Sequence, residues 1–161
     1  MRRRSSSFRT GTLAATEWFG GGVYKIAKAG GATSTVVVPP AGALGIVVDA
    51  TNVYWAGPGR GFALYDGDAG YDNRILSVAI ADAGTPVIIT STDDPWLVVA
   101  NSSAVYTVGD GTALEITETP LDGGPTKTVA RPLANAVEDI VLASDGTLYW
   151  TTDTQVQAMR P

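Results

Sequence analysis

Three stretches of the chain repeat one pattern of apolar and polar positions. Each begins with a run rich in Val, Ile and Leu, passes through a short polar turn and ends in a second apolar run that contains a tyrosine. The stretches are residues 44–56, 96–108 and 139–151, and they align without a gap. Short runs of β-branched residues separated by Asp, Asn, Ser and Gly are typical of β-hairpins. The pattern therefore predicts the same hairpin three times.

The spacing of the repeat fits four short strands. The aligned tyrosines Tyr54, Tyr106 and Tyr149 lie 52 and 43 positions apart. Further apolar runs accompany the hairpins, at residues 23–38, 75–90 and 116–130. Internal repeats of this length are typical of β-propellers, in which each repeat forms a four-stranded antiparallel blade. We therefore predict an all-β chain of about three blades without a long helix.

The apolar positions of the repeat also indicate how the blades pack. A tyrosine that recurs inside a strand is best explained by contact between neighbouring blades, and the same holds for Trp55 and Trp150. Stacking of these rings on a sugar is the alternative. Because side chains alternate across a strand, we expect the innermost strands to turn a common set of residues to one face. That set is Ile46, Val48, Val98, Val141 and Ala143.

Three segments of the repeat resemble a known family. They are Gly45-Ile-Val-Val-Asp49, Val53-Tyr-Trp55 and Pro120-Leu-Asp-Gly-Gly124, which look like the repeat of secreted myxobacterial propeller proteins. That repeat is similar to the YWTD propellers of lipoprotein receptors and to NHL repeats. The resemblance covers residues 18–161 and implies a ring of six blades, outside the cell or in the bacterial cell envelope. It does not assign a function, because such propellers serve as binding platforms, as scaffolds and occasionally as enzymes.

The repeat divides the chain unevenly. Residues 18–38 match the second half of a blade, 44–90 and 96–130 are whole blades, and 139–161 form an incomplete blade. A closed propeller takes ~4 to 8 blades. We therefore expect a partial propeller, whose ring is closed either by the missing blades of a longer protein or by self-association. We favour the longer protein, because the last repeat shows no terminal cap.

The first 17 residues show no repeat. Arg2 to Arg4 resemble the positive start of a signal peptide, but no apolar run of ~7 to 15 residues follows them. We therefore predict a disordered basic tail over residues 1–17, and no signal peptide is visible in this chain.

The composition excludes several classes of ligand and of catalytic site. The net charge of −5 disfavours binding to nucleic acid, since a phosphate backbone selects clustered Lys and Arg, and no segment is apolar enough for membrane insertion. The chain contains no His and no Cys, which excludes a Ser-His-Asp triad, a Cys nucleophile and a zinc site of ordinary composition. The sequence singles out no catalytic residue. Its composition still allows a pair of catalytic carboxylates of the kind that glycosidases use.

One connection is longer than its counterparts. The segment from Tyr54 to Ile75 is about twice as long as the segment from Tyr106 to Ile116, so this blade carries an insertion over residues 57–74. In propeller topology this connection lies on the same face as the links between blades, and insertions in repeat proteins often gather on a functional face. The candidate ligand-binding residues on this face are Phe62, Tyr65, Tyr71, Asp93, Asp94, Trp96, Glu138 and Asp139.

The insertion contains a candidate calcium loop. Asp66, Asp68 and Asp72 alternate with glycines, and a backbone carbonyl near Gly70 would add an oxygen ligand. Ca²⁺ takes six to eight oxygens, which closely spaced carboxylates on a tight turn supply. The spacing departs from the EF-hand pattern, and the alternative is a solvated Asp-Gly turn.

Two functions are consistent with these features. The first is a non-catalytic binding or scaffold propeller that holds a protein or glycan partner on the acidic loop face. The alternative is a carbohydrate-active or lyase-like enzyme with its site on the same face. Absence of His favours the first, because an imidazole is the commonest general base.

Overall fold

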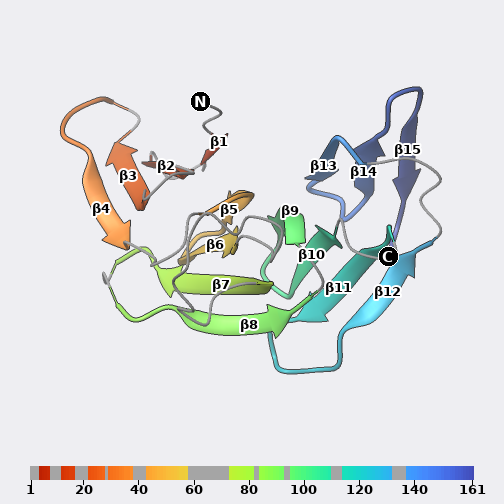
Figure 1. Cartoon of the computed structure of the whole chain (residues 1–161). Coiled ribbons are helices and arrows are strands. Elements are labelled where there is room, and N and C mark those ends of the chain that lie inside the picture. Colours follow the sequence, from red (N-terminus) through yellow and green to blue (C-terminus); the bar gives the residue numbers. More distant parts are fainter. Residues whose placement is uncertain are drawn as a thin grey trace.

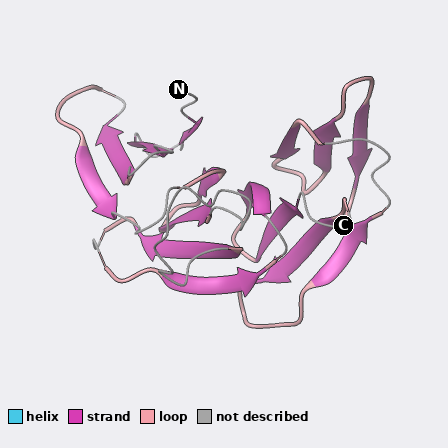
Figure 2. Cartoon of the chain, in the orientation of Figure 1, coloured by secondary structure: helices cyan, strands magenta, loops and turns pink. Residues whose placement is uncertain are grey.

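Every element of the described structure is a β-strand. The computed structural model describes residues 4–7, 12–16, 22–27, 29–37, 43–57, 73–81, 84–92, 95–109, 114–131 and 137–161. Figure 2 shows strands and connecting loops in these residues and no helix. Accordingly, these residues contain no helix long and apolar enough to cross a membrane.

The strands form four antiparallel sheets, each built from strands that follow one another in sequence. Blade 1 comprises β1 (Arg4–Ser7), β2 (Thr12–Thr16), β3 (Val23–Ala27) and β4 (Ser34–Val37). Blade 2 comprises β5 (Ile46–Val48), β6 (Asn52–Ala56), β7 (Arg74–Ala79) and β8 (Val87–Ser91). Blade 3 comprises β9 (Pro95–Ala100), β10 (Ala104–Gly109), β11 (Ile116–Pro120) and β12 (Lys127–Ala130). Blade 4 comprises β13 (Asp139–Leu142), β14 (Leu148–Thr151) and β15 (Val156–Met159). The predicted all-β architecture of four-stranded antiparallel blades is confirmed.

The blades follow one another around an arc. The first strand of each blade lies on the inner side of the arc, and β1 contacts β5, β5 contacts β9 and β9 contacts β13. Figure 1 shows blade 1 at one end of the arc and blade 4 at the other. The order of the blades in space is therefore the order of the repeats in the sequence.

The N-terminal blade differs from the sequence-based expectation. Strands β1 and β2 lie in the segment for which a disordered tail is predicted, and they pair with each other and with β3. The first sheet thus has four strands, where the repeat predicts half a blade over residues 18–38. The sequence Arg-Ser-Ser-Ser of β1 has no apolar alternation, so periodicity could not reveal it. With β1 and β2 included, the described residues form three four-stranded sheets and one three-stranded sheet.

Apolar layers between neighbouring blades make up the core. We call the side of a blade that faces the next blade its forward face, and the other side its rear face. Trp55 and Leu76 on the rear face of blade 2 pack against Val23 of blade 1. Tyr54 and Ile75 on its forward face pack against the rear face of blade 3. The predicted packing role of Tyr54 and Trp55 is confirmed, since both are buried.

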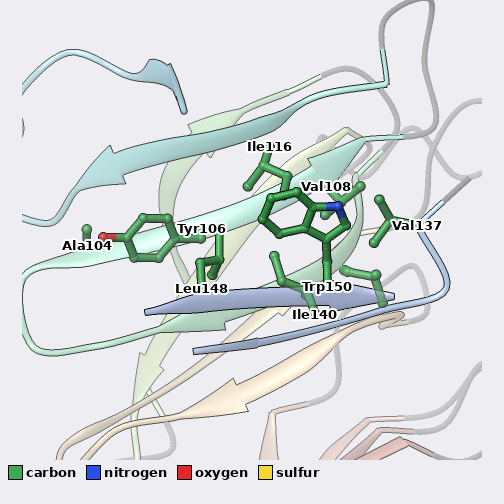
Figure 3. Packing of buried hydrophobic residues seen from close by; sticks show 9 residues of the cluster. Ala104, Tyr106, Val108, Ile116, Val137, Ile140, Leu148 and Trp150 are labelled. Carbon is green, nitrogen blue, oxygen red and sulfur yellow. The ribbon is translucent and has the colours of Figure 1, made fainter. Parts of the chain in front are cut away.

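The third layer lies between blades 3 and 4. Tyr106 and Ile116 on the forward face of blade 3 pack against Ile140, Leu148 and Trp150 on the rear face of blade 4. In Figure 3 the indole of Trp150 lies among apolar side chains of both blades. The rings of Tyr106 and Trp150 are therefore packing groups, as predicted, and their faces are not open to a sugar.

The inner strand of blade 4 corrects one predicted set of residues. Ile140 and Leu142, not Val141 and Ala143, pack toward blade 3. The turn between β13 and β14 is closed by a hydrogen bond from Ala143 N to Thr147 O, one residue longer than the turn closed by Asp49 N and Asn52 O. A shift of one residue moves every side chain of a strand to the other face. The gap-free alignment of the three hairpins hides this extra residue.

Candidate functional site

The described residues confirm which connections share an edge of the blades. The Thr92 amide, just after β8, donates a hydrogen bond of 2.9 Å to the carbonyl of Asn73, just before β7. The Gly57 amide, just after β6, donates one of 2.8 Å to the carbonyl of Arg74. Both ends of the long connection and the link to the next blade therefore meet at one edge. We call it the loop edge, and the opposite edge, where the first two strands of each blade are joined, the turn edge.

Three predicted binding residues lie at the loop edge. Trp96 is the second residue of β9, and Glu138 and Asp139 stand at the start of β13. The Glu138 amide donates a hydrogen bond of 2.9 Å to the carbonyl of Thr151 at the end of β14. Both carboxylate residues are exposed, whereas Trp96 is half-buried. Since β9 and β13 contact each other, the two carboxylates and the indole belong to neighbouring inner strands.

Trp96 is held in place by the packing of the inner strands. Its side chain contacts the apolar layers on both sides of blade 3. A Cβ atom added at Gly45 would lie 3.1 Å from the Trp96 carbonyl oxygen and 3.1 Å from the Val98 amide nitrogen. Glycine at position 45 thus permits the close approach of blade 2 to the strand that carries Trp96.

The other predicted site residues lie outside the described residues. They are the candidate binding residues Phe62, Tyr65, Tyr71, Asp93 and Asp94, and the candidate calcium ligands Asp66, Asp68, Gly70 and Asp72. The calcium site therefore stays a prediction. Within the described part of the chain, no group of three or more acidic, His or Cys side chains is placed to hold a metal ion.

The loop edge of blade 3 carries an ion pair that the motifs did not reveal. Glu115 Oε2 lies 2.6 Å from Arg131 Nη2, and both groups contact the hydroxyl of Thr128. The pair follows from strand register, because Glu115 precedes and Arg131 follows the paired residues Ile116 and Ala130. Within this pair, Arg131 offsets the charge of Glu115.

The turn edge has a different chemistry. Asp49 Oδ1 accepts hydrogen bonds from the amides of Thr51, at 2.7 Å, and Asn52, at 2.8 Å, and its Oδ2 accepts one of 2.8 Å from the Tyr54 hydroxyl. Burial raises the pKa of Asp49, but these hydrogen bonds outweigh burial and bring the pKa below its usual value. Burial and the neighbouring carboxylate raise the pKa of Tyr54 to about 12.

The same turn recurs in blade 3 with an amide in place of the carboxylate. Asn101 Oδ1 accepts hydrogen bonds of 2.9 Å from the amides of Ser103 and Ala104. Burial and the nearby Glu118 raise the pKa of Tyr106. Blade 3 thus forms the same turn with the uncharged Asn101 at the position of Asp49. Turn closure and packing therefore explain the shifted pKa values of Asp49, Tyr54 and Tyr106, which do not indicate proton transfer.

Comparison with known proteins places this geometry among known folds. No family model matches the sequence, and no curated protein matches it. A chain in the crystal structure of a nidogen/laminin complex superposes with a TM-score of 0.79 at 12% identity, over 97% of this chain and 59% of that chain. The chain has a β-propeller fold.

Two further propeller-like structures extend the match. A putative TolB from Agrobacterium tumefaciens superposes with a TM-score of 0.68 at 14% identity, over 93% of this chain and 57% of that chain. A streptogramin B lyase superposes with a TM-score of 0.64 at 17% identity, over 94% of this chain and 52% of that chain. This propeller chain thus spans between half and three fifths of these structures, and identities this low establish the fold alone.

Proposed function

We propose that the chain is a non-catalytic binding or scaffold propeller that holds a partner at its loop edge, outside the cell or in the cell envelope. The observation that carries the proposal is the position of Glu138 and Asp139. Both are exposed at the start of one inner strand, and Trp96 lies at the start of the neighbouring one. Polar and aromatic groups at the loop ends of a rigid scaffold are typical of binding sites.

The charge of this edge indicates the kind of partner. Glu138 and Asp139 are two adjacent exposed carboxylates, which attract positive groups. The net charge of −5 on the chain acts in the same direction. A protein with Lys or Arg at its contact surface is therefore the favoured partner, and a glycan is the second candidate.

A carbohydrate-active or lyase-like enzyme at the same edge is the alternative function. The propeller neighbours include a streptogramin B lyase as well as a chain of a nidogen/laminin complex, so the fold is compatible with both functions. The composition of this chain favours binding, since it offers neither the imidazole nor the thiol that most general bases and nucleophiles use.

A titration with a decalysine peptide tests the proposal. Tryptophan fluorescence should report saturable binding that weakens with salt, because exposed charges attract across solution and are screened by ions. The double variant Glu138→Gln/Asp139→Asn should weaken binding about tenfold, which corresponds to ~1.4 kcal/mol. The matched control Asp122→Asn removes a carboxylate from an exposed turn at the opposite edge and should leave the affinity unchanged.

Two results would contradict this function. Equal affinity of the wild type and both variants would show that the loop edge is not the binding surface. The second is turnover of streptogramin B or of a uronic-acid oligosaccharide by the wild type. If the Glu138→Gln/Asp139→Asn variant loses this turnover, the enzymatic alternative is established instead.

A further inference from the structure

The forward face of blade 4 is an exposed apolar surface. Val141 is 56% exposed, Tyr149 42% and Val156 73%. Strand register places Val141 beside Tyr149 and Val156 beside Thr151, so the three side chains share one side of the sheet. Exposed apolar side chains that lie side by side on one face of a sheet are a candidate interaction surface.

The same positions are buried in the other blades. Tyr149 pairs with Val141 and Ala158, as Tyr54 pairs with Val47 and Ser77 and as Tyr106 pairs with Val99 and Glu118. Tyr54 is 2% exposed and Tyr106 is 6% exposed, because the next blade covers each of them.

Val156 gives the second comparison. It opens the third strand of blade 4, at the position that Val23, Ile75 and Ile116 occupy in the other blades. Those three residues are 0% exposed. The forward face of blade 4 is therefore built as a blade interface.

The rear face of blade 1 is the complementary surface. Val23 of β3 is equivalent to Ile75 of β7, and the strand register is irregular directly after each of them. Tyr24 and Ile26 are therefore equivalent to Leu76 and Val78. Leu76 and Val78 are buried against the preceding blade, whereas Tyr24 and Ile26 are half-buried. One end of the arc thus presents a forward face and the other end a rear face.

We propose that the forward face of blade 4 binds the rear face of blade 1 of a second copy of this chain. The reason is continuity with an established contact, since a forward face packs against a rear face three times within the chain itself. The contact is head-to-tail, so each copy uses two different surfaces. Such a contact closes into a ring or continues into a chain of copies, depending on the rotation between them.

Light scattering over a range of concentrations tests this contact. The wild type should increase in mass with concentration. The variant Tyr149→Lys/Val156→Lys should remain monomeric, and so should Ile26→Lys, because each of them places a charge on one of the two faces. The matched control Val87→Lys changes a residue that is 60% exposed on the outer strand of blade 2 and should associate like the wild type.

Mixing the two interface variants gives the decisive result. Each retains the face that the other has lost, so an equimolar mixture should form a dimer of one copy of each and nothing larger. Far-ultraviolet circular dichroism establishes that the variants fold, and Val141→Lys and Tyr24→Lys replace them if either does not.

Three results would overturn the proposal. The first is a wild type that stays monomeric at every concentration. The second is an Ile26→Lys variant that still dimerises, which would indicate that two copies of blade 4 pack face to face. The third is a mixture of the two interface variants that remains monomeric.

Discussion

Blades 3 and 4 share one repeat, yet their forward faces have opposite environments. On blade 3, Tyr106 and Ile116 are buried under the next blade, whereas on blade 4 the equivalent Tyr149 and Val156 are exposed to solvent. The apolar character of these positions is the same in both blades. The difference shows that the repeat encodes the capacity to pack against a neighbouring blade, while burial itself depends on whether a neighbour is present.

The largest expected effect comes from truncating the two equivalent aliphatic residues. Ile116→Ala should lower the free energy of unfolding by about 2 to 5 kcal/mol, because it leaves a cavity between blades 3 and 4. Val156→Ala in the monomer should change it by less than about 0.5 kcal/mol, because the side chain is already in water. Urea denaturation of both variants at low protein concentration measures the difference. Equal losses of unfolding free energy in the two variants would contradict the comparison.

The tyrosine hydroxyls offer a second, smaller contrast. Tyr54→Phe removes the hydrogen bond to Asp49 and should cost about 1 to 2 kcal/mol, whereas Tyr149→Phe should be close to neutral. The raised pKa of Tyr54, about 12, means that its stabilisation is complete below the unfolded value of about 10 and is lost as the pH rises through 12. Thermal melts of Tyr54→Phe should therefore lack this alkaline component, and an unchanged alkaline limb would contradict the assignment.

Replacing Asp49 by Asn gives the smallest expected change. The amide oxygen keeps both backbone hydrogen bonds, as Asn101 does in blade 3, and the amide nitrogen donates to the Tyr54 hydroxyl in place of the bond that Asp49 Oδ2 accepts. Because the pKa of Asp49 is lowered in the folded protein, its stabilisation is present above the unfolded value of about 3.9 and is lost as the pH falls through the folded value. Asp49→Asn should thus flatten the acid limb of stability against pH while leaving neutral stability nearly unchanged. If the variant loses as much stability at low pH as the wild type, other carboxylates are responsible for that loss.

The fold could be predicted because each repeat carries its own evidence. The tyrosines and the polar turns fall at equivalent positions, and blades 2 and 3 occupy the residues that the repeat indicates. Strand β1 could not be predicted, since Arg-Ser-Ser-Ser has neither apolar alternation nor β-branched residues and depends on pairing with β2. The extra residue in the turn after β13 could also not be predicted, because a sequence alignment without gaps cannot detect a shift of strand register.

Less of the candidate site could be predicted. Propeller topology correctly places Trp96, Glu138 and Asp139 at the loop edge, since this depends only on strand order. The pairing of Glu115 with Arg131 depends on strand register and side-chain geometry, which residue spacing alone does not provide. The proposed calcium ligands Asp66, Asp68 and Asp72 lie outside the described residues and stay a prediction, for which a Ca²⁺-dependent rise in melting temperature, lost in Asp68→Ala, is the expected sign.

Hydroxyl-radical footprinting read by mass spectrometry tests the open forward face most directly. At a concentration where the chain is monomeric, Tyr149 should be modified readily, while Tyr54 and Tyr106 should be protected by the next blade. As the concentration rises and copies associate, Tyr149 should become protected and the other two should not change. Protection of Tyr149 equal to that of Tyr106 in the monomer, or ready modification of Tyr54, would contradict the account.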